Sequence, residues 1–161
     1  MDHVDRISAQ WRRERPDLNV APLASVGRLL RVAQLAEWEL AAGLADSELQ
    51  PGWFDLLAAL RRSGAPYELN PSELMRATLI SSGGITKRLD RLADAGLVER
   101  RPDPDDRRGT LVKLTRRGRS VIDGFIGVHI ANEERLLESL KPAERRALDA
   151  ALRRLLAALE P

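Results

Sequence analysis

The sequence predicts a mainly α-helical chain with one small β-hairpin. Two observations favour this fold class. Apolar residues recur three to four positions apart, the spacing of an α-helix, through most of the chain. Residues 97–114 differ, because two short apolar runs suited to strands flank a charged segment that contains Pro102 and Gly109. The length of 161 residues fits one domain, or one subunit of a small oligomer.

Three helices are expected in the first part of the chain, because helical patterns lie there between proline and glycine breakers. They extend over residues 2–15, 22–44 and 53–62. The first carries Val4, Ile7 and Trp11 on one apolar stripe. The third follows Gly52, which separates it from the segment before it.

Two shorter helices should follow, joined by a brief turn. They extend from residue 71 to about 77 and from about 82 to 95. Asn70 is an N-cap candidate for the first, and Pro71 suits its opening position. Ser81 or Ser82 is expected to cap the second, and Gly96 to end it.

A hairpin and two longer helices complete the pattern. The strands are expected at 97–101 and 111–114, joined by a turn-rich, charged loop at 102–109. Thr115 should cap a long helix that reaches about Leu140, and Pro142 should open the last helix.

Charge is distributed unevenly along the chain, although the formal net charge is only +2. Residues 76–119 hold twelve basic and six acidic side chains, so this segment carries +6 and the remainder −4. A basic middle between acidic ends is typical of a nucleic-acid footprint on a neutral scaffold. A solvated, highly charged surface is the alternative interpretation of the same pattern.

Composition excludes several other classes. The absence of cysteine excludes disulfides and thiolate catalysis, and two distant histidines, His3 and His129, argue against a zinc site. No apolar run is long enough to span a membrane, and the N-terminus lacks the pattern of a signal peptide, so we expect a cytoplasmic protein without a membrane partner. Phosphate-binding loops and nucleophile motifs are also missing, so neither an enzyme nor a cofactor is expected.

Helix, short turn, helix and basic hairpin together predict a winged helix-turn-helix. Its second helix would enter the major groove of double-stranded DNA, and the hairpin tip would reach the backbone or the minor groove. Gly83 and Gly84 leave little bulk at the start of that helix, so a phosphate can approach the backbone there. The candidate DNA contacts are Ser81, Ser82, Gly84, Thr86, Lys87, Arg88, Arg91, Arg107 and Arg108.

The terminal helices carry more apolar surface than a DNA-binding core of this size needs. We therefore expect one subunit over residues 1–161, with residues 2–44 and 116–161 mostly forming dimerisation helices. The winged-helix DNA-binding region would occupy residues 53–115. A two-fold homodimer also suits palindromic DNA, whereas a monomeric helical cap is the alternative.

Two segments resemble MarR-type repressors. Residues 81–101, SSGGITKRLDRLADAGLVERR, are similar to their recognition-helix region, and residues 103–115, DPDDRRGTLVKLT, are similar to their wing. The resemblance covers nearly the whole chain. It implies that Arg108 is the minor-groove arginine and that Asp106 orients the wing.

Further features resemble the urate-responsive, HucR/PecS-like branch of these repressors. They are the additional N-terminal helix with Trp11 and the carboxylate of Asp55 within an apolar helix. The resemblance implies a ligand site formed by Trp11, Asp55, Arg88 and Arg100. Urate is a planar anion, so arginines and an aromatic wall suit it, while repulsion of Asp55 could act as a switch. Each of the four residues also has a purely structural or DNA-contacting interpretation.

The expected function is thus a dimeric repressor, bound to a pseudo-palindrome of roughly 16–20 base pairs and released by urate or a related small anion. Three alternatives stay open. The effector could be a phenolic acid, a tricarboxylate or an antibiotic; the winged helix could work without a ligand; or it could serve as an interaction module that does not bind DNA.

Overall fold

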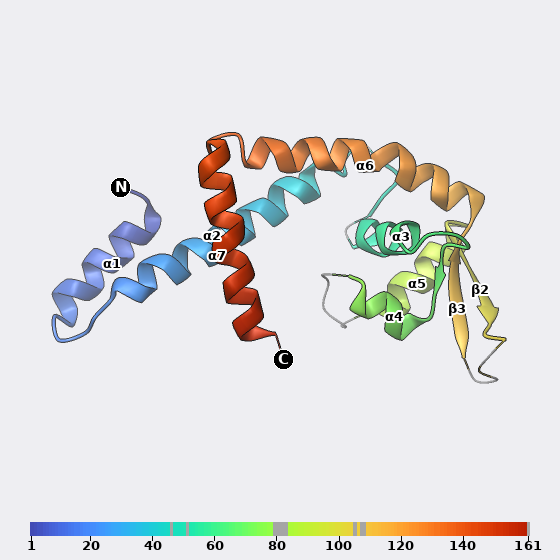
Figure 1. The fold of residues 1–161 in the computed structure, drawn as a ribbon, viewed down its shortest axis with the longest axis horizontal. Helices are drawn as coiled ribbons and strands as arrows, with labels where there is room; N and C mark the ends of the chain where they lie inside the picture. The colour runs from blue at the N-terminus through green and yellow to red at the C-terminus, as the bar shows by residue number, and fades with distance from the viewer. Residues whose placement is uncertain (46, 51, 79–83, 105, 107–108, 161) are drawn as a thin grey trace. The chain divides into compact units, whose positions relative to one another are not determined.

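The structure is a computed structural model that describes residues 1–45, 47–50, 52–78, 84–104, 106 and 109–160. The chain divides into two compact units, Met1–Ala42 and Gly43–Pro161. Seven helices and three short strands follow one another within the described residues (Figure 1). The predicted fold class, mainly helical with a small β structure, is confirmed.

The first unit is a pair of helices, α1 (His3–Glu14) and α2 (Ala21–Ala42). The carboxylate of Asp2 caps α1 by accepting a hydrogen bond from the Asp5 amide at 2.8 Å. Arg28 of α2 binds both carboxylates, with distances of 2.7 Å to Asp2 and 2.5 Å to Asp5. These ion pairs tie the start of α1 to the first half of α2.

The second unit contains the helix-turn-helix and the hairpin. Its elements are α3 (Trp53–Arg62), β1 (Glu68–Leu69), α4 (Pro71–Arg76), α5 (Ile85–Asp94), β2 (Val98–Pro102), β3 (Thr110–Leu114), α6 (Arg116–Leu136) and α7 (Pro142–Leu159). The strands form an antiparallel sheet in the order β1-β3-β2, in which Val98 lies opposite Leu114. The hairpin of β2 and β3 is therefore the predicted wing.

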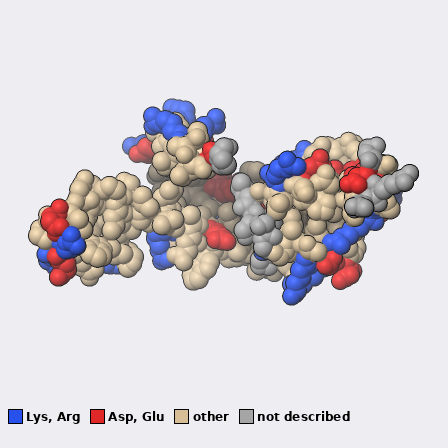
Figure 2. Space-filling model, turned by 90° about the horizontal axis from the view of Figure 1, so that it is seen from below, with Lys and Arg blue, Asp and Glu red and all other residues tan. Residues whose placement is uncertain are grey.

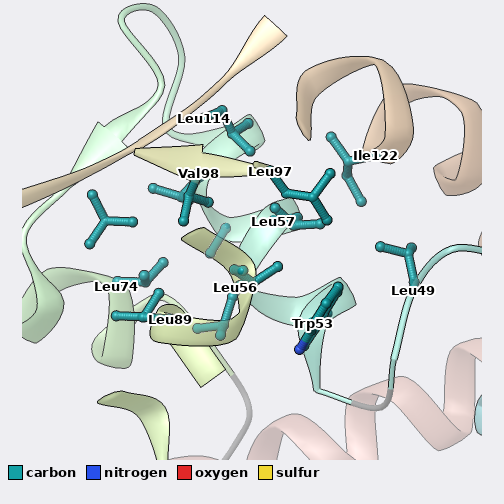
Figure 3. Packing of buried hydrophobic residues seen from close by; sticks show 14 of the residues in the cluster. Leu49, Trp53, Leu56, Leu57, Leu74, Leu89, Leu97, Val98, Leu114 and Ile122 are labelled. Carbon is teal, nitrogen blue, oxygen red and sulfur yellow. The ribbon is translucent and has the colours of Figure 1, made fainter. Parts of the chain in front are cut away.

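Leucines from several elements form the core of the second unit (Figure 3). Leu56 and Leu57 of α3 and Leu89 and Leu92 of α5 are almost completely buried. Val112 of β3 lies in the same core. Burying a leucine stabilises a fold by roughly 1.5–3 kcal/mol, so this cluster fixes α5 and the wing on α3.

The start of α6 packs tightly against the turn between α5 and β2. The hydroxyl of Thr115 accepts a hydrogen bond from the Gly118 amide at 2.9 Å and donates one to the Gly96 carbonyl at 2.8 Å. A β-carbon on Gly118 would lie only 1.9 Å from the carbonyl oxygen of Leu97. The predicted Thr115 cap is confirmed, and only glycine fits at position 118.

Three expectations about the elements need correction. The second helix of the helix-turn-helix begins at Ile85 with Gly84 as its N-cap, so the capping role expected of Ser81 or Ser82 was wrong. The long helix ends at Leu136 rather than near Leu140. Strand β1 was missed because two residues, Glu68 and Leu69, are too few to show the alternation of a strand.

Two long helices bury none of their residues in the single chain. On α2, Leu30, Val32 and Trp38 are each more than 60% exposed, and on α7 Leu155 and Leu156 are about half exposed. Large apolar side chains in such numbers on one chain are typical of an interface with another molecule. Among the described residues, no helix combines the length and the apolar character that crossing a membrane requires.

Candidate nucleic-acid interface and effector site

Helix α5 has one apolar and one polar side, which agrees with the predicted recognition helix. Leu89 and Leu92 point into the core, whereas Thr86, Lys87 and Arg91 are exposed. The α-helical period of 3.6 residues puts Lys87 nearly opposite the buried leucines. A cationic and hydrogen-bonding surface therefore faces away from the core, as a helix that reads DNA requires.

The start of α5 is open. Gly84 has a φ of +82°, and a β-carbon there would have no neighbour within 4 Å. No side chain of a described residue caps the helix. The first amide groups of an α-helix have no partner within the helix, so an acceptor can bind them. The predicted contacts Ser81 and Ser82, and the adjacent Gly83, lie outside the described residues.

The wing closes through backbone hydrogen bonds around Gly109. The Gly109 amide donates to the Asp106 carbonyl at 2.8 Å, and the Asp103 amide donates to the Gly109 carbonyl at 3.0 Å. A β-carbon on Gly109 would lie 2.8 Å from the β-carbon of Asp103. The predicted tip arginines, Arg107 and Arg108, lie outside the described residues, so their roles and the orienting role of Asp106 stay predictions.

Opposite charges alternate across the sheet below the tip. Arg101 of β2 binds the carboxylate of Glu68 on β1 through two hydrogen bonds, one of them 2.9 Å long. This carboxylate raises the pKa of the Arg101 guanidinium above its ordinary value. Lys113 of β3 lies 3.6 Å from Glu99. Figure 2 shows the result on one side of the molecule, where basic and acidic side chains are interspersed (on the right of the view).

Arg88 is half-buried and differs from the outward position that was expected for it. Its guanidinium lies against Gly52, where a β-carbon would be 2.9 Å from Nε. Nη1 is buried and has no hydrogen-bond partner among the described residues. Arg88 therefore reaches from α5 to the start of α3, the helix that carries Asp55.

Asp55 lies in the first turn of α3 and is half-buried. It forms no ion pair with Arg88, Arg100 or any other described residue, although a partly buried carboxylate is stabilised by a cation. Asp55 and the guanidinium of Arg88 thus both lie at the start of α3, but they do not form an ion pair with each other. A carboxylate and a guanidinium left in this state can each accept a new partner.

Arg100 reaches α5 from the opposite side. Its Nη2 lies 2.8 Å from the Asp90 carboxylate and 3.5 Å from the Thr86 carbonyl oxygen. Asp90 was not among the residues predicted from the sequence to bind DNA or the effector. Thr86 and Asp90 are four residues apart, so they lie on one side of α5.

A hollow of about 460 Å³ lies between the segment before α3 and the side of α5. It is lined by Gln50, Trp53, Arg91 and Asp94.

Trp11, the fourth residue of the predicted effector site, belongs to α1 of the first unit and is 46% exposed. Its association with Asp55, Arg88 and Arg100 stays a prediction. No group of three or more metal-ligating side chains occurs in the part of the chain that the structure describes.

Known proteins share this arrangement. Residues 47–109 match the MarR family. The chain is 40% identical to the HTH-type transcriptional regulator PecS of Dickeya dadantii over 151 residues. The aligned region covers 94% of this chain and 91% of PecS. This chain belongs to the MarR family. PecS is a transcriptional regulator, so the prediction of a regulator rather than an enzyme is confirmed.

Solved structures of related proteins have the same fold. BpsR of Bordetella bronchiseptica, whose DNA binding is regulated by 6-hydroxynicotinic acid, is 30% identical, with a TM-score of 0.72 over 81% of this chain and 98% of that one. A mutant MarR of Escherichia coli in complex with operator DNA is 28% identical, with a TM-score of 0.72 over 91% of this chain and 97% of that one. The predicted winged helix is thereby confirmed.

Proposed function

We propose that this MarR-family chain forms a homodimeric repressor, which binds double-stranded operator DNA and releases it when urate or a related planar anion binds. The observation that carries the proposal is the division of α5. Leu89 and Leu92 anchor one side in the core, whereas Thr86, Lys87 and Arg91 lie exposed on the other. A relative crystallised in complex with operator DNA supports DNA binding by this chain.

The DNA contacts divide between two elements. Helix α5 would enter the major groove, with its uncapped start at Gly84 against a phosphate and Lys87 and Arg91 on bases or backbone. The wing tip, with Arg107 and Arg108, would enter the narrow minor groove, whose negative potential attracts arginine. Asp106 would hold the tip in position.

Dimerisation is supported by the apolar side chains that α2 and α7 leave exposed. Leu30, Val32 and Trp38 on α2 and Leu155 and Leu156 on α7 would be buried against a second copy of the chain. Residues 2–44 and 116–161 would thus mostly serve the dimer, and residues 53–115 the DNA. Two winged helices related by a two-fold axis fit a pseudo-palindrome.

The effector site would use Trp11, Asp55, Arg88 and Arg100. Arg88 supports this assignment, because its buried Nη1 has no partner among the described residues and is ready to donate to an anion. Repulsion between the anion and Asp55, which forms no ion pair among the described residues, would push on α3. Since Arg88 belongs to α5, its movement would reach the DNA-reading surface directly.

Titration calorimetry of the purified protein with urate, beside salicylate and citrate, tests the effector. Saturable urate binding at one or two molecules per dimer, lost in Arg100→Ala, is the expected result. A gel shift with DNA from upstream of the protein's own gene tests the operator. Failure to shift that DNA at low salt, where phosphate contacts are strongest, would contradict the DNA-binding assignment.

A second candidate keeps the DNA-binding function and changes the effector. Two arginines and an aromatic wall also suit a phenolic or heteroaromatic acid, and the DNA binding of BpsR is regulated by 6-hydroxynicotinic acid. Competition titrations with urate, 6-hydroxynicotinate and salicylate separate these effectors. Stronger release of DNA by one of the carboxylic acids than by urate would favour the second candidate.

A further inference from the structure

Asp90 is the counter-ion of Arg100, and we infer that it makes the effector response depend on an exchange of partners. In this exchange an anionic effector takes Arg100 from Asp90 and uncovers a negative charge on the DNA-reading side of α5. The inference rests on the proposed function, because it requires Arg100 to meet the anion. It adds a residue to which sequence reasoning assigned no role.

The contact joins two elements that the proposed function uses separately. Arg100 belongs to β2 of the wing, opposite Val112 of β3, and Asp90 belongs to α5. The distance from Arg100 Nη2 to Asp90 Oδ1 is 2.8 Å, and the same nitrogen lies 3.5 Å from the Thr86 carbonyl oxygen. Thr86 and Asp90 are one helical turn apart, so the Arg100 guanidinium lies along one side of α5.

The pair is accessible enough to be exchanged. The Arg100 side chain is 37% exposed and the Asp90 side chain 52%. Ion pairs with this exposure contribute little to stability, so a competing anion can replace the carboxylate at modest cost. A planar anion offers the guanidinium two parallel hydrogen bonds, which are stronger than the single contact with Asp90.

Losing Arg100 would change the charge that α5 presents to DNA. Asp90 follows Lys87 by three residues, so the two side chains are neighbours on the exposed side of the helix. While Arg100 neutralises Asp90, Lys87 is free to bind a phosphate. Once Arg100 is occupied, the Asp90 carboxylate repels phosphate and competes for Lys87, so DNA affinity falls without any large movement of the helix.

The variant Asp90→Asn tests whether Asp90 competes with the anion for Arg100. The variant keeps the size of the side chain and removes the competing charge. We expect urate, or the probe anion that binds best, to bind about 2–5-fold more tightly, the range expected for loss of an exposed ion pair. The factor by which a saturating anion weakens DNA binding should fall at least about threefold, because no carboxylate is uncovered.

Asp94→Asn is the matched control. Asp94 is an exposed carboxylate one turn further along α5, and it forms no ion pair among the described residues. Its replacement changes the net charge by the same amount as Asp90→Asn. It should leave both the anion affinity and the release factor close to those of the wild type. A double variant, Asp90→Asn with Arg100→Ala, should bind the anion as weakly as Arg100→Ala alone, because Asp90 affects the anion only through Arg100. It should bind DNA more tightly than Arg100→Ala, because no uncovered carboxylate then faces the phosphates.

The outcomes distinguish this inference from the proposed function. If the wild type binds none of urate, 6-hydroxynicotinate and salicylate, or if Arg100→Ala binds them undiminished, the proposed function and this inference both fail. If Arg100→Ala loses binding while Asp90→Asn keeps the wild-type anion affinity and release factor, only the inference fails. Equal effects of Asp90→Asn and Asp94→Asn would also overturn it, because they would reflect net charge alone.

Discussion

The guanidinium of Arg88 lies against the backbone of Gly52, so that a β-carbon on Gly52 would be 2.9 Å from Nε and 3.2 Å from Cζ. This contact joins the helix predicted to read DNA to the first residue before α3. It exists only because position 52 carries no side chain. The start of α3 and the recognition helix therefore cannot move independently while Arg88 keeps this position.

Gly52→Ala should displace Arg88 and weaken operator binding. Gly52 has a φ of +80°, so alanine there also costs about 1–2 kcal/mol of backbone strain. Gly64→Ala is the control, since Gly64 has a φ of +81° and open space around its α-carbon. Urea unfolding should show a similar loss in the free energy of unfolding for both variants. Fluorescence anisotropy with labelled operator should show weaker binding for Gly52→Ala only. Equal DNA affinities would mean that the position of Arg88 does not matter for DNA binding.

Most of the fold could be predicted from the sequence, because apolar spacing and capping residues are local signals. The bounds of α3, Trp53–Arg62, agree with the expected range, and Asn70 caps α4 as expected. Strand β1 could not be predicted, since Glu68 and Leu69 become a strand only through pairing with β3. The start of α5 was misjudged because serines are common N-caps, whereas Gly84 takes that position here.

The candidate site was less accessible to sequence reasoning, because its contacts join distant segments. The resemblance to the urate-responsive branch implied that Arg88 and Arg100 both meet an anion. It could not indicate that Arg88 is half-buried against Gly52, thirty-six positions earlier, nor that Arg100 pairs with Asp90. Only the packing of α5 between α3 and β2 determines which side of the helix each arginine reaches.

Gly118→Ala should destabilise the second unit, because its β-carbon would lie 1.9 Å from the Leu97 carbonyl oxygen. A contact with backbone cannot be relieved by a side-chain rotation, so we expect a loss of about 1–3 kcal/mol or more in the free energy of unfolding. Gly124→Ala, on the same helix with no atom within 4 Å, should instead stabilise by about 0.5–1 kcal/mol. Urea unfolding measures both, and equal effects would contradict the tight junction between α6 and β2.

Lys87→Ala should weaken operator binding about equally for all DNA sequences and lower the slope of log affinity against log salt concentration by about 1. Both effects follow from losing one phosphate contact on the exposed side of α5. The control is Arg153→Ala on α7, which removes one positive charge from a side chain paired with Asp149. Anisotropy titrations at several salt concentrations compare the two variants. If Arg153→Ala lowered the operator affinity as much as Lys87→Ala does, binding would depend on net charge rather than on this lysine.

The helix pair of the first unit should lose stability in acid. Hydrogen bonds from Arg28 and from the Asp5 amide lower the pKa of Asp2 below its ordinary value of 3.8, and hydrogen bonds from the Asp2 amide and Arg28 lower that of Asp5. A carboxyl whose pKa is lowered by folding stabilises the fold above its unfolded pKa, and this contribution is lost as pH falls through the folded pKa. Stability should thus decline below about pH 4.

NMR titration of the two side-chain carboxyl groups checks this directly. Both should titrate below 3.8 in the wild type and shift upward toward that value in Arg28→Met, which keeps the length of the side chain and removes the charge, while the backbone hydrogen bonds of the capping box still lower both pKa values. The same variant should flatten the dependence of stability on pH in this range, since the carboxylates then gain nothing from folding through Arg28. Unchanged pKa values in Arg28→Met would mean that the ion pairs do not hold α1 on α2 in solution.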